Sequence, residues 1–453
     1  MATVLERIAA RAGTATDGEG RRAAERAIAD TLGCMVAGCG DPAARAVRQG
    51  LGADRIPGPS ALAGGGRSDP AIAAMVNGTA AHALDFDDNF APGMSHASAV
   101  LVPAILALGQ QRAVSGRALV DAYLAGLEAQ ALVGRGVRPE HYAAGWHATS
   151  TVGAIGTAAG CAHIAGLDPA RTVAAMSLAV STAAGMKGQF GTPAKPFHAG
   201  MAARNAVQAA LLAEAGLSGR ADILERGQGF GELMGGAMPA HWDDLPDESV
   251  PHAIRTDGLM AKIHPCCGST HNAIDMMLAL RRAHGFSAAD VAQVVVTVGR
   301  ANFRNLAYPE PRDGMEARFS MQYCVALALV QEVLSLKDFT AEAVMRPHLR
   351  ALFPRIEMRV MPIARERACL RPAHTLAVRL TDGRAFEAEM AFAHGTLRDP
   401  LTEAERIAKL RDCFDSVGRN LGDGQLEALL TVDTLPTLDP LAAVVASESP
   451  TPP

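Results

Sequence analysis

Apolar residues recur at helical spacing through the first half of the chain. In Ala23–Ala37, the residues Ala27, Ile28, Leu32 and Met35 follow one another at steps of one, three or four positions, which is the pattern of a helix with one buried face. The same spacing predicts further helices over Val100–Arg112, Gly116–Val133, Thr149–Ile164, Ala170–Ala184 and Ala199–Ala215. Long helices rich in small residues and joined by short connections predict a helical bundle.

Two Asp-Pro pairs mark helix starts in this region. Asp69-Pro70 and Asp168-Pro169 each place a favoured N-cap residue directly before a proline at the first helical position. The first pair opens a helix that runs into an acidic stretch, discussed below.

The pattern changes after about residue 255. Ala292–Gly299 is rich in β-branched residues, and Arg355–Met361 alternates polar with apolar residues. His374–Leu380 and Ala385–Met390 flank Thr381-Asp382-Gly383-Arg384, a strong hairpin signal. Helices are predicted around these strands, over Asp257–His284, Ala317–Val333 and Ala341–Leu352. This region therefore predicts an α+β domain.

The end of the chain becomes helical again over Leu401–Val417 and Gly424–Leu430, so we expect it to return to the first bundle. Thr431–Pro453 is rich in Pro, Thr and Ser and predicts a loose end. A chain of 453 residues exceeds the size at which a single core stops growing. We predict a mainly α protein with a large all-helical domain built from both chain ends (residues 1–258 and 400–445), a smaller α+β lid domain (259–399) and a loose C-terminal tail (446–453).

Composition narrows the class of partner. The hydrophobic content is 49% and the net charge is -5, with no block of Lys and Arg, so the footprint of a nucleic-acid-binding protein is absent. No apolar run reaches the ~18 residues of a membrane span, and the N-terminus lacks a basic-then-apolar signal pattern. These features predict a cytoplasmic protein that acts on small molecules.

The cysteines have the ordinary usage of an intracellular chain. Most of the eight lie inside apolar helical runs, which predicts reduced, buried thiols; they are Cys34, Cys39, Cys161, Cys266, Cys267, Cys324, Cys369 and Cys413. The adjacent pair Cys266-Cys267 lacks the spacing of a CxxC zinc or redox site, and no iron–sulfur spacing is present.

The most unusual stretch is Asn77–His96. A helix apolar through Ala81 and Leu84 ends among three carboxylates, Asp85, Asp87 and Asp88. Acidic side chains are disfavoured at this end of a helix because the macrodipole is negative there. Function is therefore a better explanation for them than helix stability.

Several interpretations of this stretch compete. In the first, the carboxylates are the solvated end of a helix. The second, a DDxxD-type magnesium site, is disfavoured because the spacing of the aspartates does not match and such a site would require more aromatic residues. A metal-dependent hydrolase would use His82, Asp85, Asp88 and His96, all of which are acceptable ligands for a divalent ion. Alternatively, an aspartate orients a histidine in an acid–base site.

Other titratable residues occur at the ends of predicted elements. His147 follows Gly145-Trp146, and Lys195 with His198 follows the glycine-rich Gly188–Gly191. Further along the chain are Lys262, His271, Ser320 and Tyr323. Each alone matches an ordinary surface or core residue. Together they describe a site for a di- or tricarboxylate, because lysines neutralise carboxylates while histidine and tyrosine move protons.

Six motifs in order resemble one family over roughly residues 5 to 430. They are Asn77-Gly-Thr-Ala-Ala-His-Ala-Leu-Asp-Phe-Asp-Asp88, Ser95-His96, His147, Lys195-Pro-Phe-His-Ala-Gly-Met-Ala-Ala-Arg204, Lys262-Ile-His-Pro-Cys-Cys-Gly268 and Arg318-Phe-Ser-Met-Gln-Tyr323. This set is similar to the MmgE/PrpD family, which includes 2-methylcitrate dehydratase, cis-aconitate decarboxylase and iminodisuccinate epimerase. The resemblance implies an all-helical domain with an α+β lid, a homodimer, and no metal or organic cofactor.

The resemblance also implies roles for individual residues. Asp85, His96, His147 and Tyr323 are expected to be catalytic. The residues expected to bind substrate are Asn89, Lys195, His198, Lys262, His271 and Ser320. The segment Lys195–Gly200 is nearer to the decarboxylase and epimerase branch, whereas Asn89 stands where the decarboxylases carry threonine, and Ala97 stands where proline is usual.

The expected function is cofactor-independent acid–base chemistry alpha to a carboxylate of a small polycarboxylate, carried out by a lyase of dehydratase or decarboxylase type. An epimerase of an iminodisuccinate-like dicarboxylate is the alternative within the family. The alternatives outside it are the metal-dependent hydrolase and a helical binding protein without turnover.

Overall fold

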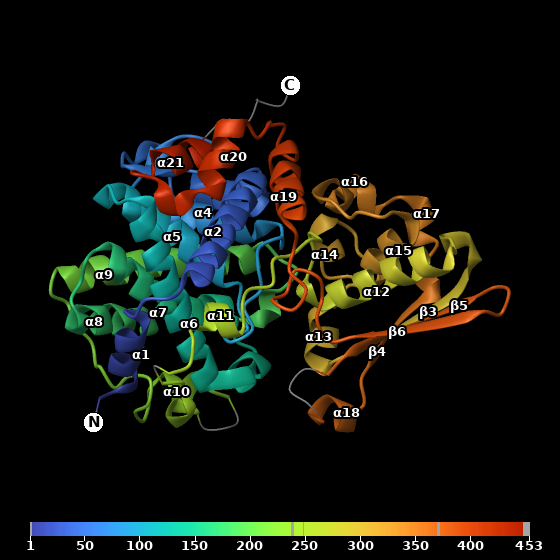
Figure 1. The fold of residues 1–453 in the computed structure, drawn as a ribbon, viewed down its shortest axis with the longest axis horizontal. Coiled ribbons are helices and arrows are strands. Elements are labelled where there is room, and N and C mark those ends of the chain that lie inside the picture. The colour runs from blue at the N-terminus through green and yellow to red at the C-terminus, as the bar shows by residue number, and fades with distance from the viewer. Residues whose placement is uncertain (1, 237–239, 248, 369–371, 447–453) are drawn as a thin grey trace.

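The computed structural model describes the chain except residues 1, 237–239, 248, 369–371 and 447–453. Cys369 and residues 447–453 of the predicted tail therefore lie outside the described residues. The protein is mainly helical, with one small mixed sheet, as predicted (Figure 1). No described helix is long and apolar enough to cross a membrane.

The described residues before 257 form eleven α-helices. They are α1 (Val4–Ala12), α2 (Gly18–Gly38), α3 (Pro42–Gly50), α4 (Pro70–Ala83), α5 (Ala97–Arg112), α6 (Gly116–Ala144), α7 (Ala148–Ile164), α8 (Pro169–Val180), α9 (Ala194–Glu214), α10 (Phe230–Met234) and α11 (Ala253–Thr256). A two-stranded hairpin, β1 (Ser60–Ala61) and β2 (Arg67–Ser68), precedes α4. The Asp69 side chain accepts from the amides of Ala71 and Ile72, and Asp168 caps α8 in the same way, which confirms both predicted helix starts.

The C-terminal helices pack on the first helices of the chain, as Figure 1 shows by the red and blue ribbons lying together. They are α19 (Glu403–Asp415), α20 (Asp423–Leu430) and α21 (Asp439–Ala446). Leu410 and Cys413 of α19 lie against Gly33 of α2, where an added Cβ would come 2.8 Å from the Leu410 side chain. The predicted loose end after residue 430 is wrong as far as α21, because Leu441, Val444 and Val445 bury their side chains in the helical core.

The sheet has the strand order β4-β3-β5-β6, formed by β3 (Val291–Val298), β4 (Ile356–Val360), β5 (His374–Leu380) and β6 (Ala385–Met390). β3 is parallel to β4 and antiparallel to β5, and β5 and β6 form the predicted hairpin. Val294 and Val296 pair with Val378 and Leu376, and all four side chains are buried. Period-two burial thus gives the sheet one core-facing side.

Helices within residues 268–367 accompany this sheet. They are α12 (Gly268–His284), α13 (Arg300–Asn305), α14 (Gly314–Ala317), α15 (Met321–Val330), α16 (Ala341–Val344), α17 (Pro347–Arg350) and α18 (Ile363–Arg367). Their core residues and those of the sheet form one hydrophobic cluster between Cys266 and Leu380, separate from the clusters of the helical region. The predicted boundaries at residues 258/259 and 399/400 stay a prediction.

Three predicted helices of this region are shorter than expected. The helix predicted over Asp257–His284 begins only at Gly268, since the preceding segment contains Pro265, which has no amide proton to donate. The helix predicted over Ala317–Val333 begins at Met321, with Ser320 as its cap. Ala341–Leu352 is divided into α16 and α17 before Pro347. Because of these breaks, Lys262 and Arg318 lie outside the helices.

Helices α4 and α9 cross at very short range. A Cβ on Gly200 would lie 2.2 Å from the Met75 carbonyl oxygen and 2.2 Å from the Thr79 hydroxyl, and a Cβ on Gly78 would lie 3.0 Å from the Gly200 Cα. Only glycine allows this approach. The crossing brings the end of α4, with its acidic stretch, next to the start of α9, which carries Lys195.

Candidate active site

The three aspartates that follow α4 are all buried. Asp85, Asp87 and Asp88 expose 2%, 0% and 2% of their surface, so the interpretation as a solvated helix end is wrong. Asp85 has a φ of 51°, in the left-handed region that residues with a Cβ seldom adopt. Such strained backbone persists where surrounding contacts fix it, and it is common at active sites.

Two lysines hold Asp85. The Lys195 Nζ donates to Asp85 Oδ1 over 2.6 Å, and the Lys262 Nζ lies 3.3 Å from Oδ2 while donating to the Asp85 carbonyl oxygen over 2.7 Å. Lys195 and Lys262 expose only 3% and 0% of their surface. Burial alone would raise the pKa of Asp85, but the two ammonium groups outweigh it and hold that pKa well below its usual range.

Asp87 lies between two histidines. His82 Nδ1 donates to Asp87 Oδ2 over 2.8 Å, and His96 Nδ1 lies 3.1 Å from the same oxygen, outside the alignment of a hydrogen bond. His96 Nε2 lies 3.9 Å from Asp85 Oδ1, so His96 spans both carboxylates. Burial raises the pKa of Asp87, but the contacts with His82 and His96 outweigh it and hold that pKa well below its usual range. The predicted pairing of an aspartate with a histidine is therefore present, with Asp87 as the nearest partner.

A second histidine pair completes the cluster. The His147 ring stacks on His82 at 5.6 Å between centroids, and its Nδ1 lies 3.2 Å from Nδ1 of His198. One of these two nitrogens must therefore carry the proton and donate it to the other. Phe190 packs edge-on against His147 at 5.0 Å, and the Lys195 Nζ lies 5.3 Å from the Phe190 ring centre. The site thus has an aromatic wall next to its imidazoles.

Burial keeps these imidazoles neutral in the free protein. It lowers the pKa of His82 to about 3 and also lowers the pKa of His96. The pKa of His147 lies well below its usual range because of burial and the neighbouring His82 and Lys195. A bound polyanion would reverse these shifts, because negative charge nearby favours the protonated imidazole.

Unpartnered polar atoms are concentrated at this cluster. Buried side-chain nitrogen and oxygen atoms without a hydrogen bond include Nε2 of His82, Oδ2 of Asp85, Oδ1 of Asp87, Nδ1 of His96 and Nε2 of His147. Asp85 Oδ2 and His96 Nδ1 still have ionic contacts at 3.3 and 3.1 Å. Buried polar groups are satisfied in the great majority of cases, so the other three atoms require an explanation. A polar ligand that enters between them would supply the missing partners.

The predicted residues Asp85, His96, His147, Lys195, His198 and Lys262 are brought together here. Asn89 has contacts with other residues: its backbone pairs with Met260, and its side chain lies against Gly268. His271 contacts the Cys266 carbonyl oxygen and the His264 ring. Neither of these two contacts of His271 involves Asp85, Lys195 or Lys262.

Tyr323 and Ser320 have structural contacts in the α+β region. The Tyr323 hydroxyl donates to the Asp338 carbonyl oxygen, and its ring packs against Phe339 and Phe353. Ser320 accepts from the Tyr323 amide as the cap of α15. Because the Tyr323 proton is already donated to the main chain, we assign it no part in proton transfer.

Asp88 differs from the other two aspartates. Its carboxyl group accepts from the amide and hydroxyl of Ser98, and that hydroxyl lies 2.7 Å from the Tyr123 hydroxyl. Burial, with Asp87 and Asp30 nearby, raises the pKa of Asp88 to about 7. Asp88 is thus held by Ser98, whereas Asp85 meets lysines and Asp87 meets histidines.

The hydrolase alternative requires a different ligand set from the one predicted. His82, Asp85, Asp87 and His96 have ligand atoms within 4.8 Å of one another, so Asp87 replaces Asp88. However, Asp85 already has two lysine ammonium groups as counter-ions. A divalent cation beside two buried ammonium groups would meet strong repulsion, and this charge arrangement instead favours an anionic ligand.

Sequence reasoning missed the roles of Asp87, Phe190 and Lys409. Lys409 of α19 donates to the Phe86 carbonyl oxygen over 2.8 Å and pairs with Asp30, with Nζ to Oδ1 at 2.7 Å. Its position on a helix 323 residues further along the chain gave no signal of this contact. The sequence shows only that Lys409 lies next to Leu410 on the apolar side of the predicted helix, where a lysine is rarely buried unless it is paired.

Two protein-family models match most of the chain. The model of the MmgE/PrpD N-terminal domain matches residues 8–243, and that of the MmgE/PrpD C-terminal domain matches residues 264–430. The chain belongs to the MmgE/PrpD family.

Its relatives include cis-aconitate decarboxylases. The mouse enzyme is 28% identical over 378 residues, covering 81% of this chain and 75% of the relative. The human enzyme is 27% identical over 76% of this chain and 73% of its own. A cis-aconitate decarboxylase of Aspergillus terreus is 24% identical over 91% of this chain and 89% of its own.

Proposed function

We propose that this protein is a lyase that removes carbon dioxide from a small unsaturated tricarboxylate of the cis-aconitate type, using acid–base groups of the chain. The observation that carries this proposal is the group of buried polar atoms without a hydrogen bond around the pairing of Asp85 with Lys195 and Lys262. The decarboxylase relatives support the lyase class over the epimerase alternative.

The lysines bind and orient the substrate in this proposal. Lys195 and Lys262 share Asp85, so the three groups together carry one net positive charge. An incoming carboxylate would take the unpartnered side of this cluster and exchange water for charge-assisted hydrogen bonds. Orientation by fixed cations also avoids reorganisation during the reaction.

The histidines transfer the proton. When the bond to the departing carboxylate breaks, its electron pair moves into the allylic system conjugated with a remaining carboxylate. One proton must then be added to carbon, and the acid that supplies it must be recharged from solvent. His96 and His147 are the candidates, because each has a buried ring nitrogen without a hydrogen bond and each becomes a stronger base once a polyanion is bound.

The residues that contact His96 and His147 have different roles in this proposal. Asp87 fixes the orientation of His82 and His96, as a carboxylate commonly does for a catalytic imidazole. His198 is the hydrogen-bond partner of His147, so their 3.2 Å contact is a route for proton exchange. Lys262 keeps its charge throughout, since Asp85 and Asp87 outweigh burial and raise its pKa.

Turnover in deuterium oxide tests the proposal. Purified protein is mixed with cis-aconitate, citrate or 2-methylcitrate, and proton NMR and released carbon dioxide are followed together. We expect carbon dioxide and one deuterium per product molecule from the unsaturated tricarboxylate. Deuterium exchange without carbon dioxide would instead identify an epimerase, and loss of water from a citrate would identify a dehydratase.

Matched histidine variants locate the chemistry. His147→Gln should lower kcat by about 10²–10⁴, the usual contribution of an acid–base group. His163→Gln is the control, since His163 is an exposed histidine at the far end of the same helix, α7. Equal activity in both variants would refute the assignment of His147.

The predicted homodimer remains part of this proposal. Light scattering during size-exclusion chromatography should give twice the mass of one chain, and a single-chain mass would contradict it.

A further inference from the structure

Arg318 opens the last of the six family motifs and has no part in the lyase chemistry proposed above. It lies between α14 and α15 with only 7% of its surface exposed. Its Nε is buried without a hydrogen bond, and among the described residues none forms a hydrogen bond or an ion pair with its guanidinium group. Buried charges are normally paired, so a guanidinium at this depth without a partner points to a ligand.

The neighbours of Arg318 place it beside the candidate active site. Its carbonyl oxygen accepts from the Cys267 amide over 2.9 Å, at the start of α12. The ring centre of the next residue, Phe319, lies 5.2 Å from the Lys195 Nζ and 6.2 Å from the ring centre of Phe190. Arg318 thus belongs to a segment of the α+β region that contacts both the lysine and the aromatic wall of the site.

The carboxylates around Arg318 are engaged elsewhere. Burial lowers the pKa of the guanidinium, and Asp41, Asp85 and Asp313 oppose this shift without forming an ion pair with it. Asp41 and Asp313 cap α3 and α14, and burial raises the pKa of Asp41. Asp85 is held by the two lysines of the site. The free hydrogen-bonding capacity at Arg318 is therefore that of a cationic donor.

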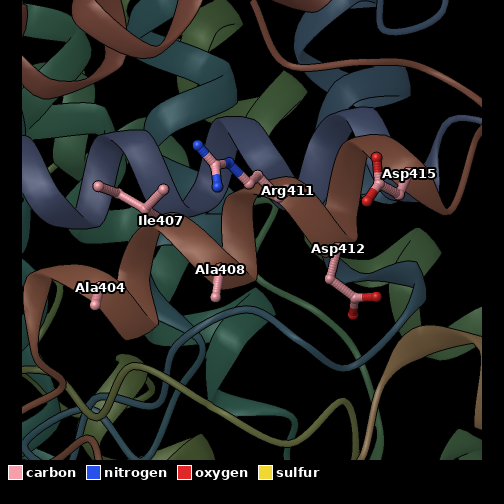
Figure 2. A pocket seen from close by; sticks show the side chains of 6 residues that line it. All are labelled: Ala404, Ile407, Ala408, Arg411, Asp412 and Asp415. Atoms are coloured by element: carbon pink, nitrogen blue, oxygen red, sulfur yellow. The ribbon is translucent and has the colours of Figure 1, made fainter.

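An aromatic ring supports the Arg318 side chain. The guanidinium carbon lies 6.0 Å from the ring centre of Phe339, in the 3₁₀ helix η5 (Leu336–Phe339). The Leu336 amide donates to Asp412 over 3.1 Å, and Asp412 lines a hollow along α19 (Figure 2). Helix α19 therefore holds η5. A ring contact of this kind orients a guanidinium and leaves its N–H donors unused.

The charges of the site leave a substrate with three carboxylates short of counter-charge. Lys195 and Lys262 are the cations of the site. Asp85 and Asp87 both have pKa values well below the usual range, so both carry a negative charge near neutral pH. Burial keeps the imidazoles neutral, so the four charged side chains sum to zero. Arg318 is a further buried cation, and a guanidinium binds a carboxylate through two parallel hydrogen bonds.

We propose that Arg318 binds a second carboxylate of the substrate, separate from the one that Lys195 and Lys262 bind. This inference rests on the proposed function, since it assigns the residue that recognises a further carboxylate of that substrate class. The lysines orient one end of the molecule, and Arg318 fixes another. The site thereby favours a polycarboxylate over a monocarboxylate.

Calorimetric titration with propane-1,2,3-tricarboxylate tests the assignment without turnover, because this probe is saturated. Arg318→Gln should weaken its binding by about ten- to a hundredfold, the loss expected for one charge-assisted contact. Arg359→Gln makes the same charge change at an exposed arginine of β4 and should bind as the unmodified protein does. Equal affinity in the two variants, or no binding by the unmodified protein, overturns the proposal.

Thermal unfolding of the protein without ligand separates a binding arginine from a structural one. Arg318→Gln should leave the melting temperature unchanged or raise it, because a buried charge without a partner costs folding free energy. A fall of several degrees would reveal a structural partner for the guanidinium and overturn the proposal.

The double variant Arg318→Gln/Lys195→Met tests whether two carboxylates are recognised separately. The fold-losses of the single variants should multiply, since independent contacts have additive free energies. A double variant that binds no more weakly than either single variant would place both side chains on one carboxylate and overturn the proposal.

Carbon dioxide release from cis-aconitate distinguishes failure of this inference from failure of the lyase proposal. Release that is unchanged in Arg318→Gln, with unchanged probe binding, overturns only the role of Arg318. Probe binding that depends on Arg318 in a protein that releases no carbon dioxide supports the role of Arg318 and overturns only the lyase proposal.

Discussion

Asp85 provides the sharpest test of the charge arrangement at the site. Its carboxylate is 2.6 Å from the Lys195 Nζ and 3.3 Å from the Lys262 Nζ, and all three side chains are buried. With an effective dielectric constant of about 20, these separations correspond to attractions of ~6 and ~5 kcal/mol. The desolvation of three ions costs several kcal/mol each and offsets much of this attraction.

Replacement of Asp85 by Asn removes both attractions and leaves two buried ammonium groups without a counter-ion. Breaking a buried pair in this way costs about 3–5 kcal/mol of unfolding free energy. Lys195→Met should cost less, ~1–3 kcal/mol, because Asp85 keeps Lys262 as a partner. The double variant Asp85→Asn/Lys195→Met should lose less than the sum of the two, by about 0.5–3 kcal/mol, since one unpaired charge has also been removed.

Urea unfolding followed by circular dichroism at neutral pH measures these differences in free energy. Asp433→Asn, at a carboxylate that is paired with Arg21 at the edge of the helical region, is a control for removing an ion pair with greater solvent exposure. A loss below 1 kcal/mol for Asp85→Asn would refute the reasoning, and so would additive losses in the double variant.

Two further predictions concern other parts of the fold. The pKa of Asp88 in the folded protein, about 7, is above the ~3.9 of an aspartate in the unfolded chain. Between pH ~3.9 and about 7 the folded state therefore binds a proton that the unfolded state does not, so the free energy of unfolding falls as the pH rises through this range. Asp88→Asn should match the unmodified protein near pH 4 and be less sensitive to pH up to 7 in thermal melts; parallel pH curves would contradict the burial argument. Gly200→Ala should cost about 1–3 kcal/mol in urea unfolding, because its Cβ would lie 2.2 Å from the Met75 carbonyl oxygen and would separate α4 from α9. Gly50→Ala at the end of α3, where a Cβ meets nothing within 4 Å, is its control, and equal stability of the two variants would show that the crossing tolerates a methyl group.

Local sequence signals located most elements of the fold. The hairpin of β5 and β6 has the predicted bounds, because Asp382-Gly383 turn chemistry and period-two alternation act over neighbouring residues. Asp69 and Asp168 likewise start their helices as predicted. The errors occur where tertiary packing decides: α21 is apolar enough to join the core despite its Pro and Thr neighbours, and the chain leaves helical geometry around Lys262 and Ser320.

The candidate site was predictable as a set of residues and less so as a geometry. His147, Lys195 and Lys262 were identified because charged or titratable groups at element ends are unusual in apolar settings, and they do converge. The same reasoning placed Tyr323 at the site, but its hydroxyl turns to the Asp338 carbonyl oxygen. The order of residues in the sequence does not show in which direction the Tyr323 side chain points, and the carbonyl group that it contacts lies 15 residues away.

The amino-acid sequence by itself determined the helical bundle, the sheet hairpin and the family, because these depend on short-range periodicity and on motifs in order. Tertiary structure alone decided which aspartate does what. Asp85 meets two lysines from distant segments, Asp87 meets two histidines, and Asp88 turns to Ser98, although the three lie within four residues. The left-handed backbone at Asp85 and the close crossing of α4 and α9 set these directions, and both depend on contacts more than a hundred residues apart in sequence.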